Sequence, residues 1–249
     1  MVDTASRSVA SLAVLMAASA ASLVLVPAIA LRYSYSTLTA VESLVGFLTL
    51  LATASVLWTI GARALRRPDA ASRVRAIRVG LVLGLLWLAE ISINNFLAPP
   101  LPARDIVDDV FWAAISIAIL VLAARAAHRT GRLKAGVEAG VWSGLASGLV
   151  ACLTALSMVV FGMSFVTADP LNVAEWAARE ASAKAPSMEA YFAFETFAGG
   201  LMHLVLLGLI MGVVLGAVGG ALGKGAWLAG RRRPAEDDDQ AQAPRGSRT

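Results

Sequence analysis

The feature that most constrains this chain is a series of six apolar runs. Each run is about as long as the roughly 20 helical residues that cross the hydrocarbon core of a bilayer. Charged residues or Pro/Gly clusters separate the runs, which cover Val9–Leu31, Thr39–Ile60, Val79–Ala98, Val107–Ala127, Ala139–Val166 and Phe197–Gly223. Hydrophobic residues make up 58% of the 249 residues and charged residues 15%, against about 45 to 50% and about 25% in soluble domains. The sequence therefore predicts an all-α integral membrane protein, a bundle of six transmembrane helices within residues 1–230.

Basic residues gather in every second connection between the runs. The connection after the second run carries Arg63, Arg66, Arg67, Arg73, Arg75 and Arg78. The connection after the fourth run and the chain after the sixth carry Arg125, Arg129, Arg132, Lys134, Lys224, Arg231, Arg232 and Arg233. The remaining connections hold only Arg32, Arg104, Arg179 and Lys184. Because basic loops stay in the cytoplasm, we expect a multi-pass protein of the cell membrane, inner or plasma, with both termini cytoplasmic.

Two segments outside the runs have their own patterns. Residues 167–195 form the longest predicted extracytoplasmic loop, and a short helix is expected there because Asp169 can cap a helix and Pro170 suits its first turn. Residues 231–249 combine charge blocks with Pro, Gly and Gln, which is typical of a disordered tail, here a cytoplasmic one.

The first run also has a second interpretation. Ala28-Ile29-Ala30 resembles a signal-peptidase site, and Arg7 precedes the apolar stretch. A cleaved signal peptide therefore stays open as an alternative to a first transmembrane helix, although the stretch is longer than the usual signal core.

Several classes of site and partner are disfavoured by composition. Cys152 is the only cysteine, so it has no partner for an intramolecular disulfide or a cysteine-based zinc site. The net charge of +4 comes from basic residues beside apolar runs, so orientation in a membrane explains it and nucleic acid is not an expected partner. We expect no cofactor and no metal. The bias toward Arg and Ala favours a GC-rich bacterial source.

Glycine recurs every four residues in the last two runs. The fifth run carries Gly136, Gly140, Gly144 and Gly148, and the sixth carries Gly208, Gly212, Gly216 and Gly220. This spacing puts small residues on one stripe of a helix and lets another helix backbone approach closely. We expect the two helices to pack through these stripes, with a homo-oligomer interface as the alternative.

Polar residues inside the runs are the candidate site. They are Glu90, Asn94 and Asn95 in the third run, Asp108 and Asp109 at the start of the fourth, and His203 in the sixth. Because ionisable groups are costly in hydrocarbon, they are functional hypotheses by default, and oxygen ligands of this kind suit a proton or a hard cation. The third and fourth runs form a hairpin around residues 99–102, so the sequence predicts an outward-facing polar cavity above a base closed by glycines.

Each of these residues also has a structural interpretation. Asp105 and Asp108 resemble the acidic start of a helix with a capping box. Asn94 and Asn95 can hold helices together through hydrogen bonds, and His203 can be a packing residue.

No catalytic motif stands out, so an enzyme is not expected. The favoured hypothesis is a non-enzymatic accessory or sensory subunit of a membrane assembly, with another membrane protein or a second copy as partner in the lipid bilayer. The alternative is a small transporter or permease that binds a proton or cation at Glu90.

Overall fold

The computed structural model describes residues 2–61, 63 and 70–232 of the chain. Arg66, Arg67 and all but the first two residues of the predicted tail lie outside these ranges. The protein is 92% helix, with no strand in the part of the chain that the structure describes. Six of its helices are long and apolar enough to cross a membrane, so the prediction of an all-helical, multi-pass chain is confirmed at this level.

The elements follow one another along the chain with short connections. The first half contains α1 (Val2–Tyr33), α2 (Thr37–Val56), η1 (Leu57–Gly61), α4 (Ala70–Ser92), η2 (Ile93–Leu97) and α5 (Ala103–Thr130). The second half contains α6 (Leu133–Phe161), α7 (Met163–Ala168), α8 (Pro170–Ala183), α9 (Met188–Met202), η3 (His203–Met211) and α10 (Gly212–Arg232). The elements η1, η2 and η3 are π-helical turns that continue the α-helix before them.

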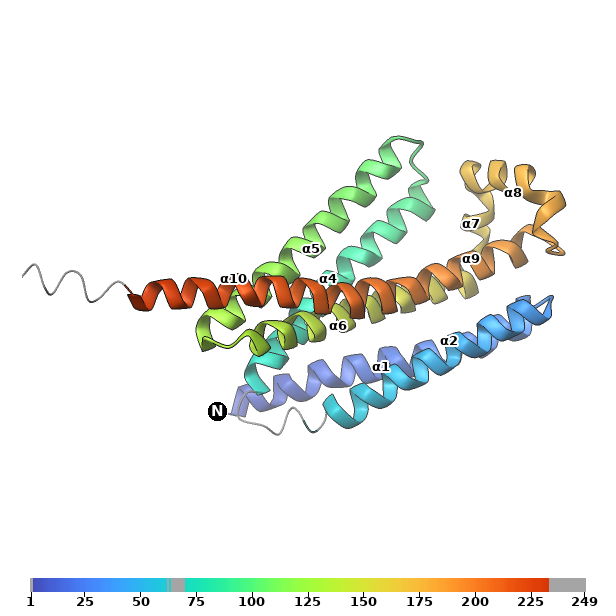
Figure 1. Ribbon diagram of the computed structural model, residues 1–249. Coiled ribbons are helices and arrows are strands. Elements are labelled where there is room, and N and C mark those ends of the chain that lie inside the picture. Colours follow the sequence, from blue (N-terminus) through green and yellow to red (C-terminus); the bar gives the residue numbers. More distant parts are fainter. Residues whose placement is uncertain (1, 62, 64–69, 233–249) are drawn as a thin grey trace, which may run out of the picture.

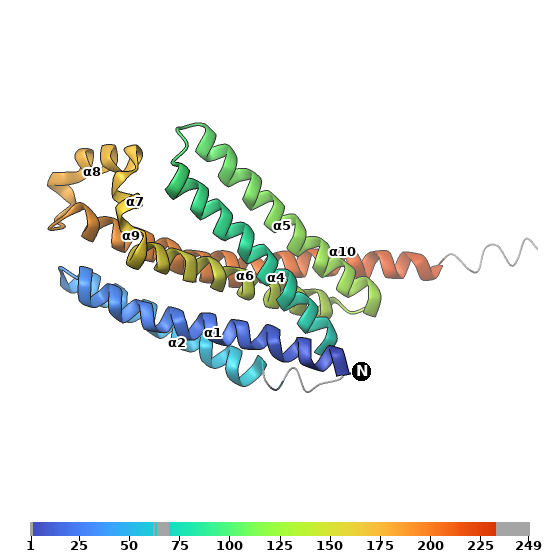
Figure 2. The same ribbon diagram turned by 180° about the vertical axis from the view of Figure 1, so that it is seen from behind.

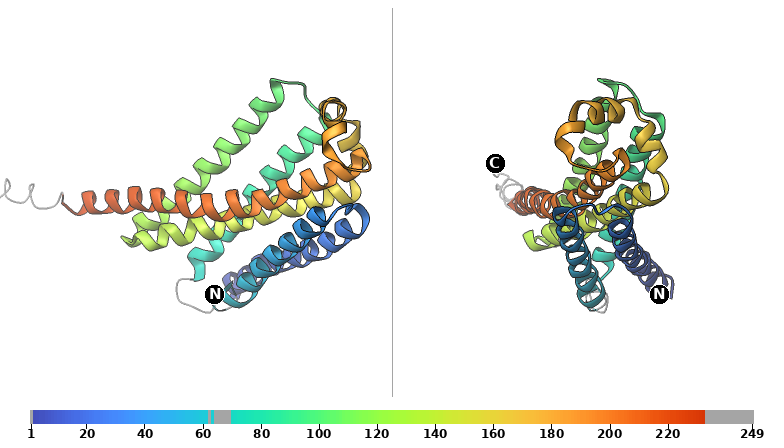
Figure 3. Two further views of the ribbon diagram at one scale, coloured as in Figure 1. Left: turned by 45° about the vertical axis from the view of Figure 1, so that its right-hand side comes forward. Right: turned by 90° about the vertical axis from the view of Figure 1, so that its right-hand side faces the viewer.

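The helices α1 with α2 and α4 with α5 form two hairpins on either side of a central pair (Figure 1, Figure 2). The central pair is α6 and the continuous helix α9–η3–α10, which run antiparallel (Figure 3). The most apolar window of α6 is 67% buried, against 17% for that of α5, so α6 is the core helix and α5 is peripheral. We call the end of the bundle at which α8 lies the α8 end, and the opposite end, where α6 begins, the basic end.

The third span begins earlier than the sequence predicts. Its helix α4 starts at Ala70 and not at Val79, so Arg73, Arg75 and Arg78 lie on helix instead of in a loop. Arg73 is buried and bonded to Glu138 of α6. A buried charge is tolerated where it is paired, so Arg73 does not stop the helix here.

The fifth and sixth spans also have different bounds. The fifth ends at Phe161 and not at Val166, because Gly162 ends the helix. The sixth begins at Met188 and not at Phe197, because the Ser187 side chain caps its first turn through the backbone N–H of Ala190. The predicted loop 167–195 is correspondingly shorter.

Three aromatic residues of α9 belong to the core. Tyr191, Phe192 and Phe194 of α9 are all buried. The rings of Tyr191 and Phe192 meet edge-on, and so do the rings of Phe194 and Phe197. The short helix expected within 167–195 is confirmed as α8, with Asp169 accepting from the N–H of Leu171 as the cap and Pro170 in the first turn.

The structure places the two glycine ladders against each other, between α6 and η3–α10. A Cβ atom added at Gly212 would stand 2.8 Å from the backbone oxygen of Gly140, and one added at Gly148 would stand 2.9 Å from the Cα of Gly208. The contact includes every ladder glycine: Gly136, Gly140, Gly144, Gly148, Gly208, Gly212, Gly216 and Gly220. Backbone meets backbone along this line, so no larger side chain fits.

Two further glycine pairs, which were not predicted from the sequence, lie at contacts between helices. Gly80 and Gly84 of α4 lie against α6, where an added Cβ at Gly80 would stand 2.7 Å from the Cβ of Ala146. Gly219 and Gly223 of α10 lie against α5 in the same way. Both pairs have the four-residue spacing of the two ladders. Two glycines at this spacing therefore mark the contacts of α4 and α5 with the central pair.

Candidate functional site

Asn94 joins the two acidic side chains of the α4–α5 hairpin. Its Nδ2 donates to Oε1 of Glu90 and to Oδ1 of Asp108, at 2.7 Å each. Glu90 and Asn94 lie one turn apart on the same face, and the hairpin turn brings Asp108 opposite them. The two carboxyl groups therefore lie side by side around one amide nitrogen.

The hairpin gets its shape from local sequence. A π-helical turn, η2, ends α4 and contains Asn94, and Ala98 after it adopts a left-handed conformation with φ of 44°. The Pro-rich segment at 99–102 cannot continue the helix, and α5 starts directly after it. Isolated π-helical turns are common at functional sites because the extra residue redirects a side chain.

Glu90 is the most enclosed residue of the site, with 7% of its surface exposed. Its second oxygen, Oε2, is buried and has no hydrogen-bond partner among the described residues, and the same holds for Oδ1 of Asn94. Both atoms are acceptors that face no donor. Each atom can accept a hydrogen bond or bind a hard cation, so the two atoms offer buried oxygen ligands beside the Asn94 bridge.

The charges of the pair also need a counterpart. Two carboxylates about 5 Å apart repel by roughly 3 kcal/mol at an effective dielectric constant of about 20. Neighbouring carboxyl groups avoid this cost by sharing a proton or by binding a cation. The pair can therefore take up and release one positive charge.

An ion pair that the sequence did not reveal closes the site at the α8 end. Arg104 donates through Nη2 to Oδ2 of Asp169 at 2.7 Å and to the backbone oxygen of Asn94 at 3.0 Å. The Asp169 side chain is 2% exposed and the Arg104 side chain 17%. Because Asp169 also caps α8, this single contact connects α8 to the α4–α5 hairpin. The separation of 65 positions explains why spacing alone gave no signal.

Four acidic or amide residues behave differently from expectation. Asn95 points to its own helix and donates to the backbone oxygen of Ile91, so it does not join the pair. Asp109 is exposed. Asp105 and Asp108 do not form a capping box: the residue before the first turn of α5 is Pro102, with no side-chain cap, and Asp108 bonds to Asn94.

His203 packs against an aromatic side chain of α4. Its ring stands edge-on to Trp87, with centroids 4.9 Å apart, and not beside the asparagines. Nδ1 lies 2.7 Å from the backbone oxygen of Gly199 and must carry the hydrogen, because a carbonyl only accepts. The ring is thus fixed at the first residue of η3. Trp87 also contacts Trp112, so it joins α4 to α5 by packing.

A small cavity of about 20 Å³ lies below these rings. Trp87, Trp112, Ser116 and Ser147 are among its lining residues. The Ser147 hydroxyl is buried and has no partner in the described part of the chain. Since a single water needs about 10 to 15 Å³ of such volume and polar partners, this cavity is large enough for one.

Among the described residues no group of three or more His, Cys, Asp or Glu side chains is arranged to hold a metal ion. No family model, no curated protein and no solved structure matches the chain. The chemistry of the site therefore rests on its own geometry, a two-carboxyl pair bridged by an amide.

Proposed function

We propose that this protein is a small multi-pass membrane transporter or permease in which the Glu90–Asp108 pair carries a proton or a hard cation. The observation that carries the proposal is the Asn94 bridge between two carboxyl groups, with the Oε2 of Glu90 buried and unbonded. Ionisable groups inside apolar bundles mark ion and proton pathways.

The proposal includes insertion with the basic end in the cytoplasm. Arg73, Arg132 and Lys134 lie at that end, and the positive-inside rule assigns it to the cytoplasmic side. Glu90 then lies toward the outer side, below α8. The glycine contacts supply the closed inner half, and the water-sized cavity beside Ser147 lies between the two regions.

Proton flux into proteoliposomes tests this function. The purified chain is reconstituted with an internal pH dye, and a potassium diffusion potential drives cations inward. Wild-type protein should acidify the lumen, and Glu90→Gln should lower the rate by about tenfold or more, since removal of the acid raises the barrier for transfer by at least about 1.4 kcal/mol. A sodium-sensitive dye in place of the pH dye separates a proton from a cation.

Asp109→Asn is the matched control, because Asp109 is adjacent to Asp108 and is exposed. It should retain wild-type flux. Equal flux in wild type, Glu90→Gln and empty vesicles, with intact folding, would contradict a transport role. That outcome would favour the other hypothesis, an accessory or sensory subunit, for which a partner would then be sought.

A further inference from the structure

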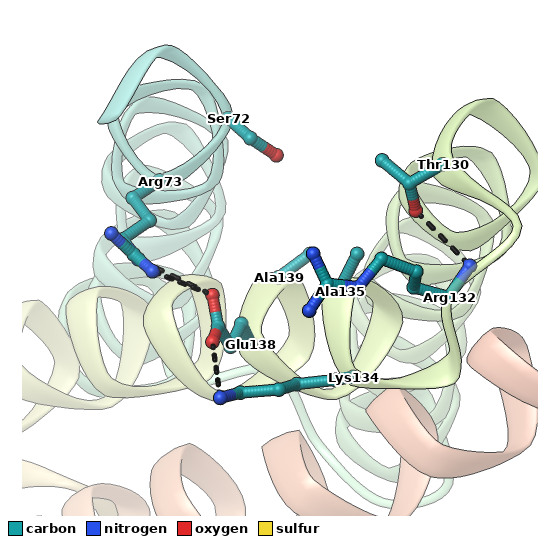
Figure 4. Close-up of a pocket in the computed structure, with 8 residues that line it drawn as sticks. All are labelled: Ser72, Arg73, Thr130, Arg132, Lys134, Ala135, Glu138 and Ala139. Atoms are coloured by element: carbon teal, nitrogen blue, oxygen red, sulfur yellow. Dashed lines mark hydrogen bonds and ion pairs between the residues drawn. The ribbon is translucent and has the colours of Figure 1, made fainter. Parts of the chain in front are cut away.

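A basic pocket opens at the end of the bundle opposite the Glu90 site. It has a volume of about 250 Å³, roughly eight waters at about 30 Å³ each. It lies where α4 begins, α5 ends and α6 begins, and its walls come from Ser72, Arg73, Thr130, Arg132, Lys134, Ala135, Glu138 and Ala139 (Figure 4). Three basic side chains and one acidic side chain line it.

The single carboxylate is already bonded. Oε2 of Glu138 accepts from Nε and Nη2 of Arg73, at 3.2 and 3.1 Å. Oε1 of Glu138 lies 3.8 Å from Nζ of Lys134. Glu138 therefore joins Arg73 and Lys134 at one wall of the pocket.

Arg132 adds a third cation. Its side chain reaches across the first turn of α6 toward the middle of the pocket (Figure 4). No acidic residue of the described chain pairs with it, and its backbone N–H donates to the Thr130 hydroxyl at 3.3 Å, which fixes the loop. The planar guanidinium suits two-point binding of phosphate oxygens.

The start of α6 adds to the positive potential. The helix has no side-chain cap at Arg132 and no acidic residue in its first turn, so its N-terminal partial charge is not offset there. Lys134 and Ala135 of that turn line the pocket. Charge, shape and donors all fit an anion with several oxygens.

We infer that this pocket binds a phosphate group, carried either by the headgroup of an anionic lipid or by a free phosphate compound. With the basic end in the cytoplasm, the pocket would lie at the level of the inner headgroups, where basic pockets between helices bind anionic lipids. The site is distinct from the Glu90 pair and does not depend on transport.

Thermal unfolding and binding of the full chain in a nonionic detergent test this site. The probes are inorganic phosphate, short-chain phosphatidic acid and, as the uncharged comparison, short-chain phosphatidylcholine, at equal ionic strength. Wild type should be stabilised by at least one of the two phosphate probes and not by phosphatidylcholine. Arg132→Gln with Lys134→Gln should weaken binding by about a hundredfold, at about tenfold for each charge contact.

Arg129→Gln is the control, because it removes an exposed charge of the same region that does not line the pocket. It should bind like wild type. Stabilisation by phosphatidic acid alone assigns the site to a lipid headgroup, and stabilisation by inorganic phosphate assigns it to a free phosphate. The inference is overturned if neither probe stabilises wild type, or if the double variant and wild type respond equally.

Discussion

Gly144→Leu is expected to remove most of the folded protein from a membrane preparation. A Cβ atom at this position would overlap the backbone oxygen of Gly208 and stand 3.0 Å from the Cα of Gly212. Backbone atoms cannot move aside as a side chain can, so α6 and α10 would have to separate. Overpacking costs about 1 to 3 kcal/mol even where side chains can adjust, and we expect at least the upper value here. The yield of monodisperse protein after detergent extraction measures the effect.

Gly225→Leu is the matched control. Gly225 lies in α10, and nothing lies within 4 Å of the Cβ atom that a substitution would add. Gly225→Leu makes the same substitution in α10, one of the two helices that meet at the ladders, and should elute like wild type. Equal yield and elution of Gly144→Leu and Gly225→Leu would show that the ladder contact does not hold the central pair together.

Asp169→Asn should destabilise the α8 end strongly. Asparagine can still cap α8, but it leaves the Arg104 charge without its ion-pair partner in a largely buried place. Breaking a buried pair from one side costs about 3 to 5 kcal/mol, and we expect the lower value because Arg104 keeps some exposure. Hydrogen exchange of α8 and the thermal unfolding midpoint both report the loss.

Glu175→Gln is the control for this prediction. Glu175 and Arg179 form an exposed pair on the same helix, with side chains 38% and 58% exposed. Such surface pairs contribute about 0 to 1 kcal/mol, and glutamine keeps an oxygen that can still accept the 3.1 Å hydrogen bond from the Tyr191 hydroxyl, so little change is expected. If Asp169→Asn is as mild as Glu175→Gln, the contact between Arg104 and Asp169 does not tie α8 to the hairpin.

Most of the fold could be predicted from sequence patterns that extend over many residues. The apolar runs predicted six long helices because hydrophobicity over about 20 residues is a strong signal, and the structure has them. The bounds were less predictable. Ser187 starts α9 through one side-chain hydrogen bond, and Gly162 ends α6. Single capping residues therefore decide where these two helices begin and end.

The candidate site was only partly predictable. The predicted hairpin around residues 99–102 placed Glu90, Asn94 and Asp108 near one another, because residues equally far from a turn lie at a similar depth in the membrane. The prediction did not find Arg104 and Asp169, whose contact joins segments with no shared period. It also did not find the contact of the His203 ring with Trp87, which joins two separate helices. Tertiary contacts of this kind leave no local pattern.

The infrared spectrum of the purified protein at neutral pH tests the central claim most directly. A carboxyl group that holds a proton has a carbonyl stretch that an ionised carboxylate lacks, and added sodium should remove the band if a cation can replace the proton. Wild type and Asp109→Asn should show this band, and Glu90→Gln should not. A spectrum without it in wild type, unchanged by sodium, would mean that both Glu90 and Asp108 are ionised and hold neither a proton nor a cation, which would contradict the proposed site.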